Sequence, residues 1–210
     1  YLNGQLLKYV FMVVFTTALS FGLTYMFGYE DEASSVPAED EEAGAIIEEE
    51  TTGTVPETLQ DETIISPIVG QAVALENVND PVFSSGAMGQ GIAIKPTEGV
   101  VYAPADAEVT IAFATGHAFG LKTANGAEVL IHVGIDTVSM NGEGFDQKVA
   151  QGDKVKAGDV LGTFDSAKIA AAGLDDTTMV IVTNTSDYAS VTPVATGAVA
   201  KGDAIIEVKA

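Results

Sequence analysis

The sequence predicts an all-β fold, an antiparallel β-sandwich or barrel over residues 63–210, preceded by one transmembrane helix and a disordered acidic linker. Three observations support this prediction. From Ile64 onward, short β-branched runs recur roughly every ten to twenty residues between glycine turns. Two stretches of this region are repeated within it. The residues before it lack this pattern and form one long uncharged run followed by an acidic run.

The uncharged run covers residues 9–29, YVFMVVFTTALSFGLTYMFGY. A helix of this length, at about 1.5 Å per residue, spans the hydrocarbon core of about 30 Å. The alternatives are a secretory signal peptide or a buried soluble helix, but the run is longer than a signal h-region, and Tyr9, Tyr25 and Tyr29 suit the membrane interfaces. We therefore predict one transmembrane helix in this run, and because the chain also starts without Met, we interpret the chain as the C-terminal piece of a longer protein.

Residues 30–62 hold 13 acidic side chains and no basic one. They lack periodic apolar positions and are rich in Glu, Ser, Thr, Ala and Pro, so burial cannot offset the entropy of ordering them. A flexible chain of this length has a root-mean-square span of about 30 Å. We therefore expect a solvated linker that lets the following domain move near the membrane.

Residues 63–210 carry 17 acidic residues against 8 lysines, a net charge of −9. A chain of this size can bury about two-thirds of its unfolded surface, enough for one core. Its acidic surface and the lack of Arg argue against nucleic-acid binding. Because the sequence has no Cys, disulfides, thiolate metal sites and cysteine nucleophiles are excluded within it.

Two internal repeats support the β-rich prediction. Residues 66–73 (SPIVGQAV) are echoed by residues 103–110 (APADAEVT), and residues 156–161 (KAGDVL) by residues 200–205 (AKGDAI). Such repeats indicate paired β-hairpin units that close on one core. Gly-Asp pairs at 152/153, 158/159 and 202/203 fit turns, in which Gly adopts the left-handed backbone and Asp caps the turn.

The chain has only two histidines, His117 in ATGHAFG and His132 in EVLIHVGIDTV. His132 lies in an apolar run that is normally buried, so a neutral imidazole is expected. Neutral imidazole is a nucleophile that can accept a phosphoryl group on one ring nitrogen while a hydrogen bond holds the other. From composition alone, ordinary structural histidines remain an open alternative.

Residues 126–138, GAEVLIHVGIDTV, resemble the phosphohistidine signature of the glucose-family (type 1) EIIA domain of the phosphoenolpyruvate-dependent sugar phosphotransferase system. Further matching segments extend the resemblance over residues 64–210. They are Ser66-Pro67, DPVF at 80–83, GIAIKP at 91–96, Ala103-Pro104, residues 113–119 and GEGF at 142–145. The resemblance implies an antiparallel β-sandwich built on a duplicated hybrid motif.

The resemblance also implies a phosphotransferase component of a sugar transport system. By this resemblance, His132 accepts phosphate from the phosphocarrier HPr on Nε2 and passes it to a cysteine of an EIIB domain. His117 matches the histidine that steadies the phosphoryl group, and Thr115 matches a hydroxyl that orients the pair. Because phosphoryl transfer depends on positioning and charge stabilisation, neither a metal nor another cofactor is expected.

A partner-binding face is implied by the same resemblance, with an apolar rim and two acidic positions near the histidines. Its residues are Asp80, Val82, Phe83, Phe113, Asp136 and Val138. Exposed apolar patches of this kind usually bind partners. The sequence departs from the family pattern at Gln90, Ala107 and Ser139, which puts partner preference in doubt and leaves the transfer residues intact.

The membrane helix resembles the last helix of an EIIC permease, and the order permease then EIIA is typical of the β-glucoside and sucrose branch. This implies a bacterial cell-membrane protein whose EIIA domain faces the cytoplasm, with HPr, EIIB and the EIIC permease as partners. EIIB could lie on the same or a separate polypeptide. Lys8 alone would place the acidic linker outside, but a single base is a weak topological signal.

Two other functions fit parts of the pattern. One is a regulatory module whose docking depends on phosphorylation, with an intermolecular zinc ion shared by His117, His132 and a partner carboxylate. The other is a zinc metallopeptidase using His132 and Asp136, for which a third strong ligand is missing.

Overall fold

The computed structural model describes residues 59–210. The predicted membrane helix at residues 1–29 and the linker up to residue 58 lie outside the described residues. Within residues 59–210, no helix is long and apolar enough to cross a membrane. The first strand, β1, begins at Glu62, one residue before the expected start of the domain.

The described residues form 14 strands with short helical turns between them. The strands are β1 (Glu62–Ile65), β2 (Gly70–Ala74), β3 (Gln90–Pro96), β4 (Val100–Tyr102), β5 (Ala107–Ala112), β6 (Ala118–Thr123), β7 (Glu128–His132), β8 (Phe145–Gln147), β9 (Lys154–Val155), β10 (Val160–Phe164), β11 (Thr178–Val182), β12 (Ser190–Pro193), β13 (Gly197–Val199) and β14 (Ala204–Lys209). The helices are η1 (Leu75–Asn77), α2 (Pro81–Ser84), η2 (Thr137–Met140), α3 (Ser166–Ala171) and η3 (Thr185–Asp187).

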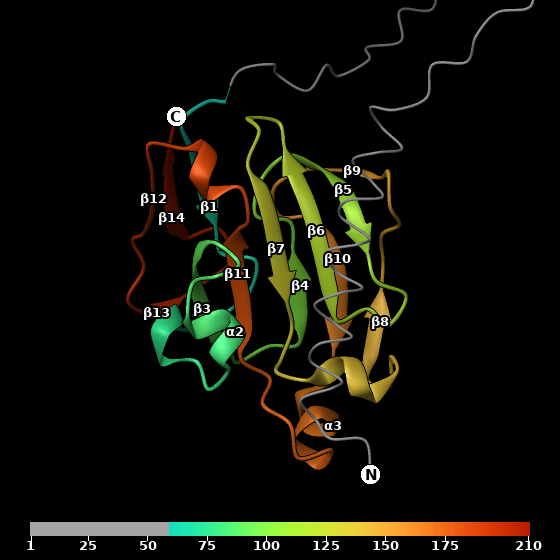
Figure 1. Cartoon of the computed structure of the whole chain (residues 1–210). Coiled ribbons are helices and arrows are strands. Elements are labelled where there is room, and N and C mark those ends of the chain that lie inside the picture. Colours follow the sequence, from blue (N-terminus) through green and yellow to red (C-terminus); the bar gives the residue numbers. More distant parts are fainter. Residues whose placement is uncertain (1–58) are drawn as a thin grey trace, which may run out of the picture. The chain divides into compact units, whose positions relative to one another are not determined.

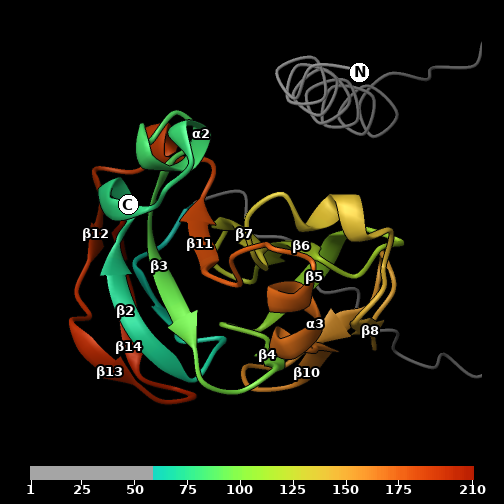
Figure 2. The same ribbon diagram turned by 90° about the horizontal axis from the view of Figure 1, so that it is seen from below.

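All strand pairings are antiparallel, which confirms the predicted fold class. An eight-stranded sheet has the order β13-β2-β3-β11-β7-β6-β5-β9, and two three-stranded sheets have the orders β1-β14-β12 and β4-β10-β8 (Figure 1). Figure 2 shows β4, β8 and β10 lying across from β5 and β6. The two layers pack closely, because a Cβ on Gly162 of β10 would lie 3.0 Å from the Phe119 ring of β6.

The predicted repeat reappears in the hydrogen bonding. The strands that begin within the first repeat pair, β2 and β5, each take a short edge partner, β13 and β9 respectively. Ser66 N donates to the Asp203 carbonyl at 2.7 Å, and the equivalent Ala103 N donates to the Asp159 carbonyl at 2.8 Å. The large sheet is therefore built from two related halves that meet where β11 pairs with β7.

The three Gly-Asp turns form as predicted. Gly152, Gly158 and Gly202 have φ of 91°, 88° and 92°. The carboxylate of the following Asp accepts a hydrogen bond of 2.8 Å from the backbone N–H three residues earlier in each turn, at Ala150, Lys156 and Ala200. These Gly-Asp pairs therefore stabilise turns between strands.

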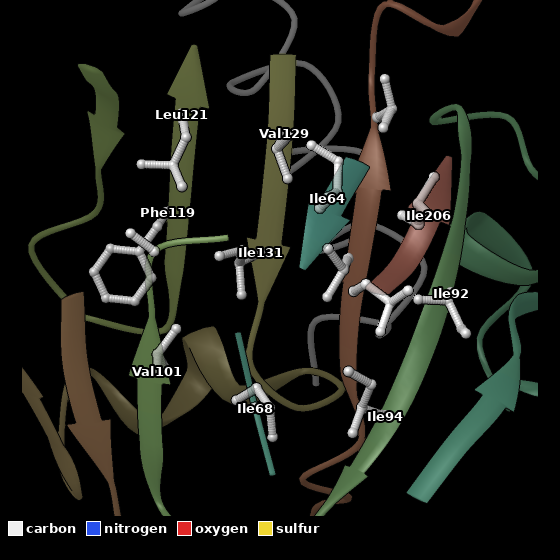
Figure 3. Close-up of a cluster of buried hydrophobic side chains, with 14 of the residues drawn as sticks. Ile64, Ile68, Ile92, Ile94, Val101, Phe119, Leu121, Val129, Ile131 and Ile206 are labelled. Carbon is white, nitrogen blue, oxygen red and sulfur yellow. The ribbon is translucent and has the colours of Figure 1, made fainter. Parts of the chain in front are cut away.

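The core lies between the layers and is filled by alternate residues of the large sheet. Figure 3 shows Val129 and Ile131 of β7 directed into the same cluster as Phe119, Ile92 and other apolar side chains. Because successive side chains of a strand point to opposite faces, His132 lies on the other face of β7. Phe83 of α2 lies against His132 on this face.

Candidate functional site

The two histidines are brought together by the pairing of β6 with β7. Ala118, the first residue of β6, is opposite His132, the last residue of β7. The Val133 N–H donates to the His117 carbonyl at 2.8 Å, which holds the ends of the two strands together. The ring centroids of His117 and His132 are 5.1 Å apart at an interplanar angle of 80°. Both side chains are buried, with relative exposures of 0% and 5%.

His132 has a defined tautomer. Its Nδ1 lies 2.8 Å from the Gly134 carbonyl oxygen, which can only accept, so Nδ1 carries the hydrogen and Nε2 the lone pair. Burial lowers the pKa of His132 to about 4, although the Gly134 bond and the charges of Asp80 and Asp136 act in the opposite direction. The imidazole is therefore neutral at pH 7, as expected from the sequence.

His117 is neutral for a similar reason. Its Nδ1 lies 2.6 Å from the Thr115 hydroxyl, so these two predicted residues do interact. Burial, with a smaller contribution from His132, lowers the pKa of His117 to about 3. Among the described residues, its buried Nε2 has no hydrogen-bond partner. A buried polar nitrogen of this kind calls for an explanation, and a bound ligand is one.

The apolar rim lies against both rings. Phe83 and His132 have ring centroids 5.1 Å apart, and Phe113 and His117 have centroids 5.3 Å apart. Val82, beside Phe83 on α2, is among the few exposed large apolar side chains of the described region, at 38%. The structure thus brings together three of the four predicted apolar residues around α2 and the histidines.

The predicted acidic positions flank the histidine pair. Asp80 is buried and caps α2, accepting hydrogen bonds from the backbone N–H groups of Val82 at 2.8 Å and Phe83 at 3.2 Å. It therefore sets the position of the Phe83 ring as well as contributing charge. Asp136 is exposed, adopts the left-handed conformation with φ 57°, and precedes η2, on which Val138 is half-buried.

Gly134 is a site residue that the sequence reasoning did not single out. Its φ of 76° turns the chain immediately after β7 and directs its carbonyl to His132 Nδ1. A glycine two residues after a histidine that ends a strand is the signal that could have indicated it. Within residues 59–210, no group of three or more His, Asp or Glu side chains could hold a metal ion.

Known proteins are similar to this chain in sequence and in fold. Residues 62–188 match the family model described as phosphoenolpyruvate-dependent sugar phosphotransferase system, EIIA 1. The chain is 44% identical over 194 residues to a beta-glucoside-specific EIIBCA component from Dickeya chrysanthemi, covering 90% of this chain and 30% of that protein. It is 46% identical over 142 residues to a glucose-specific EIIA component from Bacillus cereus, covering 68% of this chain and 86% of that protein.

A solved structure, glucose permease IIA from Mycoplasma capricolum, superposes with a TM-score of 0.67 at 35% identity and covers 70% of this chain and 96% of that chain. The present chain spans less than a third of the two beta-glucoside-specific relatives from Dickeya chrysanthemi and Bacillus subtilis, 30% and 27% of their lengths. EIIA domains of this family need no cofactor. The chain belongs to the EIIA 1 family of the phosphoenolpyruvate-dependent sugar phosphotransferase system, whose members are phosphotransferase components of sugar uptake systems.

Proposed function

We propose that His132 accepts a phosphoryl group from phospho-HPr on Nε2 and passes it to a cysteine of an EIIB domain. The observation that carries this proposal is the hydrogen bond from His132 Nδ1 to the Gly134 carbonyl. It assigns the lone pair to Nε2 of a neutral ring, and a neutral imidazole is the nucleophilic form. The low pKa of about 4 keeps the ring in that form at neutral pH.

His117 is the group that stabilises the phosphoryl group in this proposal. If the Thr115 hydroxyl donates to His117 Nδ1, the hydrogen of His117 lies on Nε2, the buried atom without a partner. Such an N–H can donate to a phosphoryl oxygen on the adjacent His132. Because the chain has no Arg, a preorganised N–H donor in a dry site is a suitable source of charge stabilisation.

The face around the histidines is the proposed docking surface for HPr and EIIB. Phe83 and Phe113 contact the rings, Val82 is exposed beside them, and Asp136 is exposed near the site. An apolar centre with an acidic margin fits partners that present a basic margin around an apolar patch. Asp80, buried under α2, supports this face, and Val138 contributes from η2.

We infer the cellular setting from the names of the relatives. EIIBCA components carry EIIB, EIIC and EIIA in one protein, so residues 1–29 are proposed as the end of an EIIC permease in a bacterial cell membrane, residues 30–62 as the linker and residues 63–210 as a cytoplasmic EIIA domain. A tether of this kind raises the local concentration of the carrier near its acceptor. Phosphorylation-coupled uptake of a sugar is the proposed outcome.

The test is intact-mass measurement of the full chain in mild detergent after incubation with phosphoenolpyruvate, the general phosphotransferase enzyme and HPr. The expected result is an acid-labile addition of one phosphoryl group, located on His132 by peptide mapping at alkaline pH. A His132→Gln chain should stay at its unmodified mass. Labelling of His117, or no labelling of a folded chain, would refute the assignment.

A further inference from the structure

The tautomer of His132 depends on where the Gly134 carbonyl points, and the surrounding loop shows what holds that carbonyl. Residues 133–136 join β7 to η2 and contain two left-handed residues, Gly134 at φ 76° and Asp136 at φ 57°. A Cβ on Gly134 would lie 2.8 Å from the Asp175 carbonyl oxygen and would overlap the Thr137 methyl group. Gly134 is therefore packed between these two residues.

Thr137 closes the loop on one side. Its side chain is completely buried, and its hydroxyl donates to the carbonyl oxygen of Val133, the residue that precedes Gly134. Its methyl group is the one that fills the space beside Gly134. Because a β-branched side chain has few rotamers, the hydroxyl and the methyl group constrain the Val133–Gly134 peptide together.

The turn before β11 supports the loop on the other side. The Asp175 carbonyl accepts a hydrogen bond of 2.8 Å from the Ile135 N–H. The Asp175 carboxylate accepts from the Thr177 N–H at 2.8 Å and from the Thr177 hydroxyl at 2.6 Å, which fixes this turn. Asp175 thus holds the Gly134–Ile135 peptide, which carries the Gly134 carbonyl, and the Thr137 hydroxyl holds the preceding Val133–Gly134 peptide.

We propose that Thr137 is a positioning residue for phosphoryl transfer: its hydroxyl holds the Val133–Gly134 peptide so that the Gly134 carbonyl receives His132 Nδ1–H and Nε2 presents its lone pair. This rests on the proposed function of His132. The tautomer of a histidine is set by the hydrogen bond of its other nitrogen, so a rotated Gly134 carbonyl removes the bias toward Nδ1–H. Without the hydroxyl, the buried Val133 carbonyl loses this donor. The Val133–Gly134 peptide can then turn, and because it is joined through the Gly134 Cα to the peptide that carries the Gly134 carbonyl, that carbonyl shifts with it.

The direct test compares Thr137→Val, which keeps the shape and removes the hydroxyl, with Thr137→Ser, which keeps the hydroxyl. Because the chain has only two histidines, ring ¹⁵N labelling of the full chain in detergent resolves the tautomer of His132 by long-range ¹H–¹⁵N correlation. Thr137→Val should lose the predominance of the Nδ1–H form. Its rate of acceptance from phospho-HPr should fall about ten-fold or more, since small misplacements of a reacting group slow transfer steeply. Thr137→Ser should restore both within about two-fold.

Thr123→Val is the matched control. Thr123 is also buried and its hydroxyl also donates, but it lies at the far end of β6 and contacts Glu62. Thr123→Val should leave the His132 tautomer and the transfer rate unchanged.

A Thr137→Val chain with the wild-type tautomer and rate would overturn the proposal. If Thr137→Val does not fold, Thr137→Ala is compared with Thr137→Ser instead, with the His132 tautomer and the rate of phosphoryl acceptance as the two readouts. Failure of the wild-type chain to be phosphorylated would refute the proposed function, whereas the tautomer comparison would still decide the role of Thr137.

Discussion

The rings of His117 and His132 lie in a T-shaped arrangement, with centroids 5.1 Å apart, because β6 and β7 pair Ala118 with His132. His132 Nδ1 bonds to the Gly134 carbonyl, and His117 Nδ1 lies within hydrogen-bond distance of the Thr115 hydroxyl. Burial keeps both rings neutral at pH 7. The pair therefore combines the nucleophilic Nε2 of His132 with the Nε2 of His117, which can donate a hydrogen bond to the phosphoryl group that His132 receives.

The two histidines should have separable roles. We expect His132→Ala to abolish phosphoryl acceptance, because it removes the acceptor atom. His117→Ala should still be labelled by phospho-HPr but should block onward transfer to EIIB, because the group that stabilises the phosphoryl in transit is lost. Labelling and chase assays with purified HPr and EIIB measure the two steps. Equal loss of labelling in both variants would contradict this division.

Stability should fall on mild acidification. The folded-state pKa values of about 4 for His132 and about 3 for His117 lie below the ordinary 6.5, so the unfolded chain binds more protons than the folded chain below pH 6.5. The contribution of the buried neutral histidines is therefore complete above pH 6.5 and is lost as the pH falls toward 4.

At about 1.4 kcal/mol for each unit of pKa, the combined effect amounts to several kcal/mol. Urea unfolding of the wild-type chain at pH 7.5 and pH 5 measures it. The double variant His117→Gln, His132→Gln is the control, because it retains every other titrating group. If its stability falls as steeply between the two pH values as that of the wild-type chain, the histidines are not the cause.

Gly134→Ala should damage the protein more than an ordinary left-handed glycine substitution. Both Gly134 and Gly152 have positive φ, 76° and 91°, but a Cβ on Gly152 would meet nothing within 4 Å. We expect Gly152→Ala to cost about 1 kcal/mol from its backbone conformation alone. Gly134→Ala adds overlap with Thr137 and Asp175 and should cost about 2–4 kcal/mol, together with a loss of phosphoryl acceptance. Chemical denaturation and mass labelling of both variants provide the comparison.

Glu62 should destabilise the domain at neutral pH through its charge. Its half-buried carboxylate accepts from the Thr123 hydroxyl at 2.7 Å and the Ala127 N–H at 3.2 Å, yet burial raises its pKa. A raised carboxylate pKa means that the folded state favours the neutral acid, so stability is lost as the pH rises above the unfolded value. Glu62→Gln keeps an acceptor oxygen without the charge.

We therefore expect Glu62→Gln to raise the Tm by a few degrees at pH 7.5 and to have little effect at pH 4, where the carboxyl is largely protonated in both states. Thermal unfolding followed by circular dichroism measures both. A lower Tm at pH 7.5 would show that the carboxylate's hydrogen bonds outweigh its burial.

Val82 should matter for docking and not for folding. Its side chain is 38% exposed next to Phe83, whereas Val160, at 42%, begins β10 in the separate three-stranded sheet. Val82→Asp should slow phosphoryl acceptance about ten-fold or more by placing a charge in an apolar contact, with little change in unfolding free energy. Val160→Asp should leave acceptance unchanged. Labelling quenched at fixed times, with HPr limiting, measures the acceptance rates of the two variants. Equal rates for Val82→Asp and Val160→Asp would show that Val82 is not part of the docking surface.

Local signals in the sequence were sufficient for much of the fold. Alternation and β-branched residues identified the region of strands. The Gly-Asp turns and the repeats 66–73 and 103–110 indicated two related halves. The structure shows these halves in the equivalent pairings of β2 with β13 and of β5 with β9. The short helices α2 and η2 carry no such signal, because a single turn is too short to show a period and is stabilised by its surroundings. The start of β1 at Glu62 was also not apparent, because its hydrogen bonds go to β14 at the other end of the chain.

The sequence by itself determined that His132 ends an apolar strand and that the region belongs with the EIIA pattern, since both depend on residues close along the chain. The resemblance implied that His117 lies beside His132, but only the tertiary structure decided the geometry of the two rings, that Gly134 sets the tautomer, and that Thr137 and Asp175 hold Gly134 in place. These relations depend on strand register, left-handed backbone and burial. Such properties arise when distant segments pack and exclude water, and no local pattern encodes them.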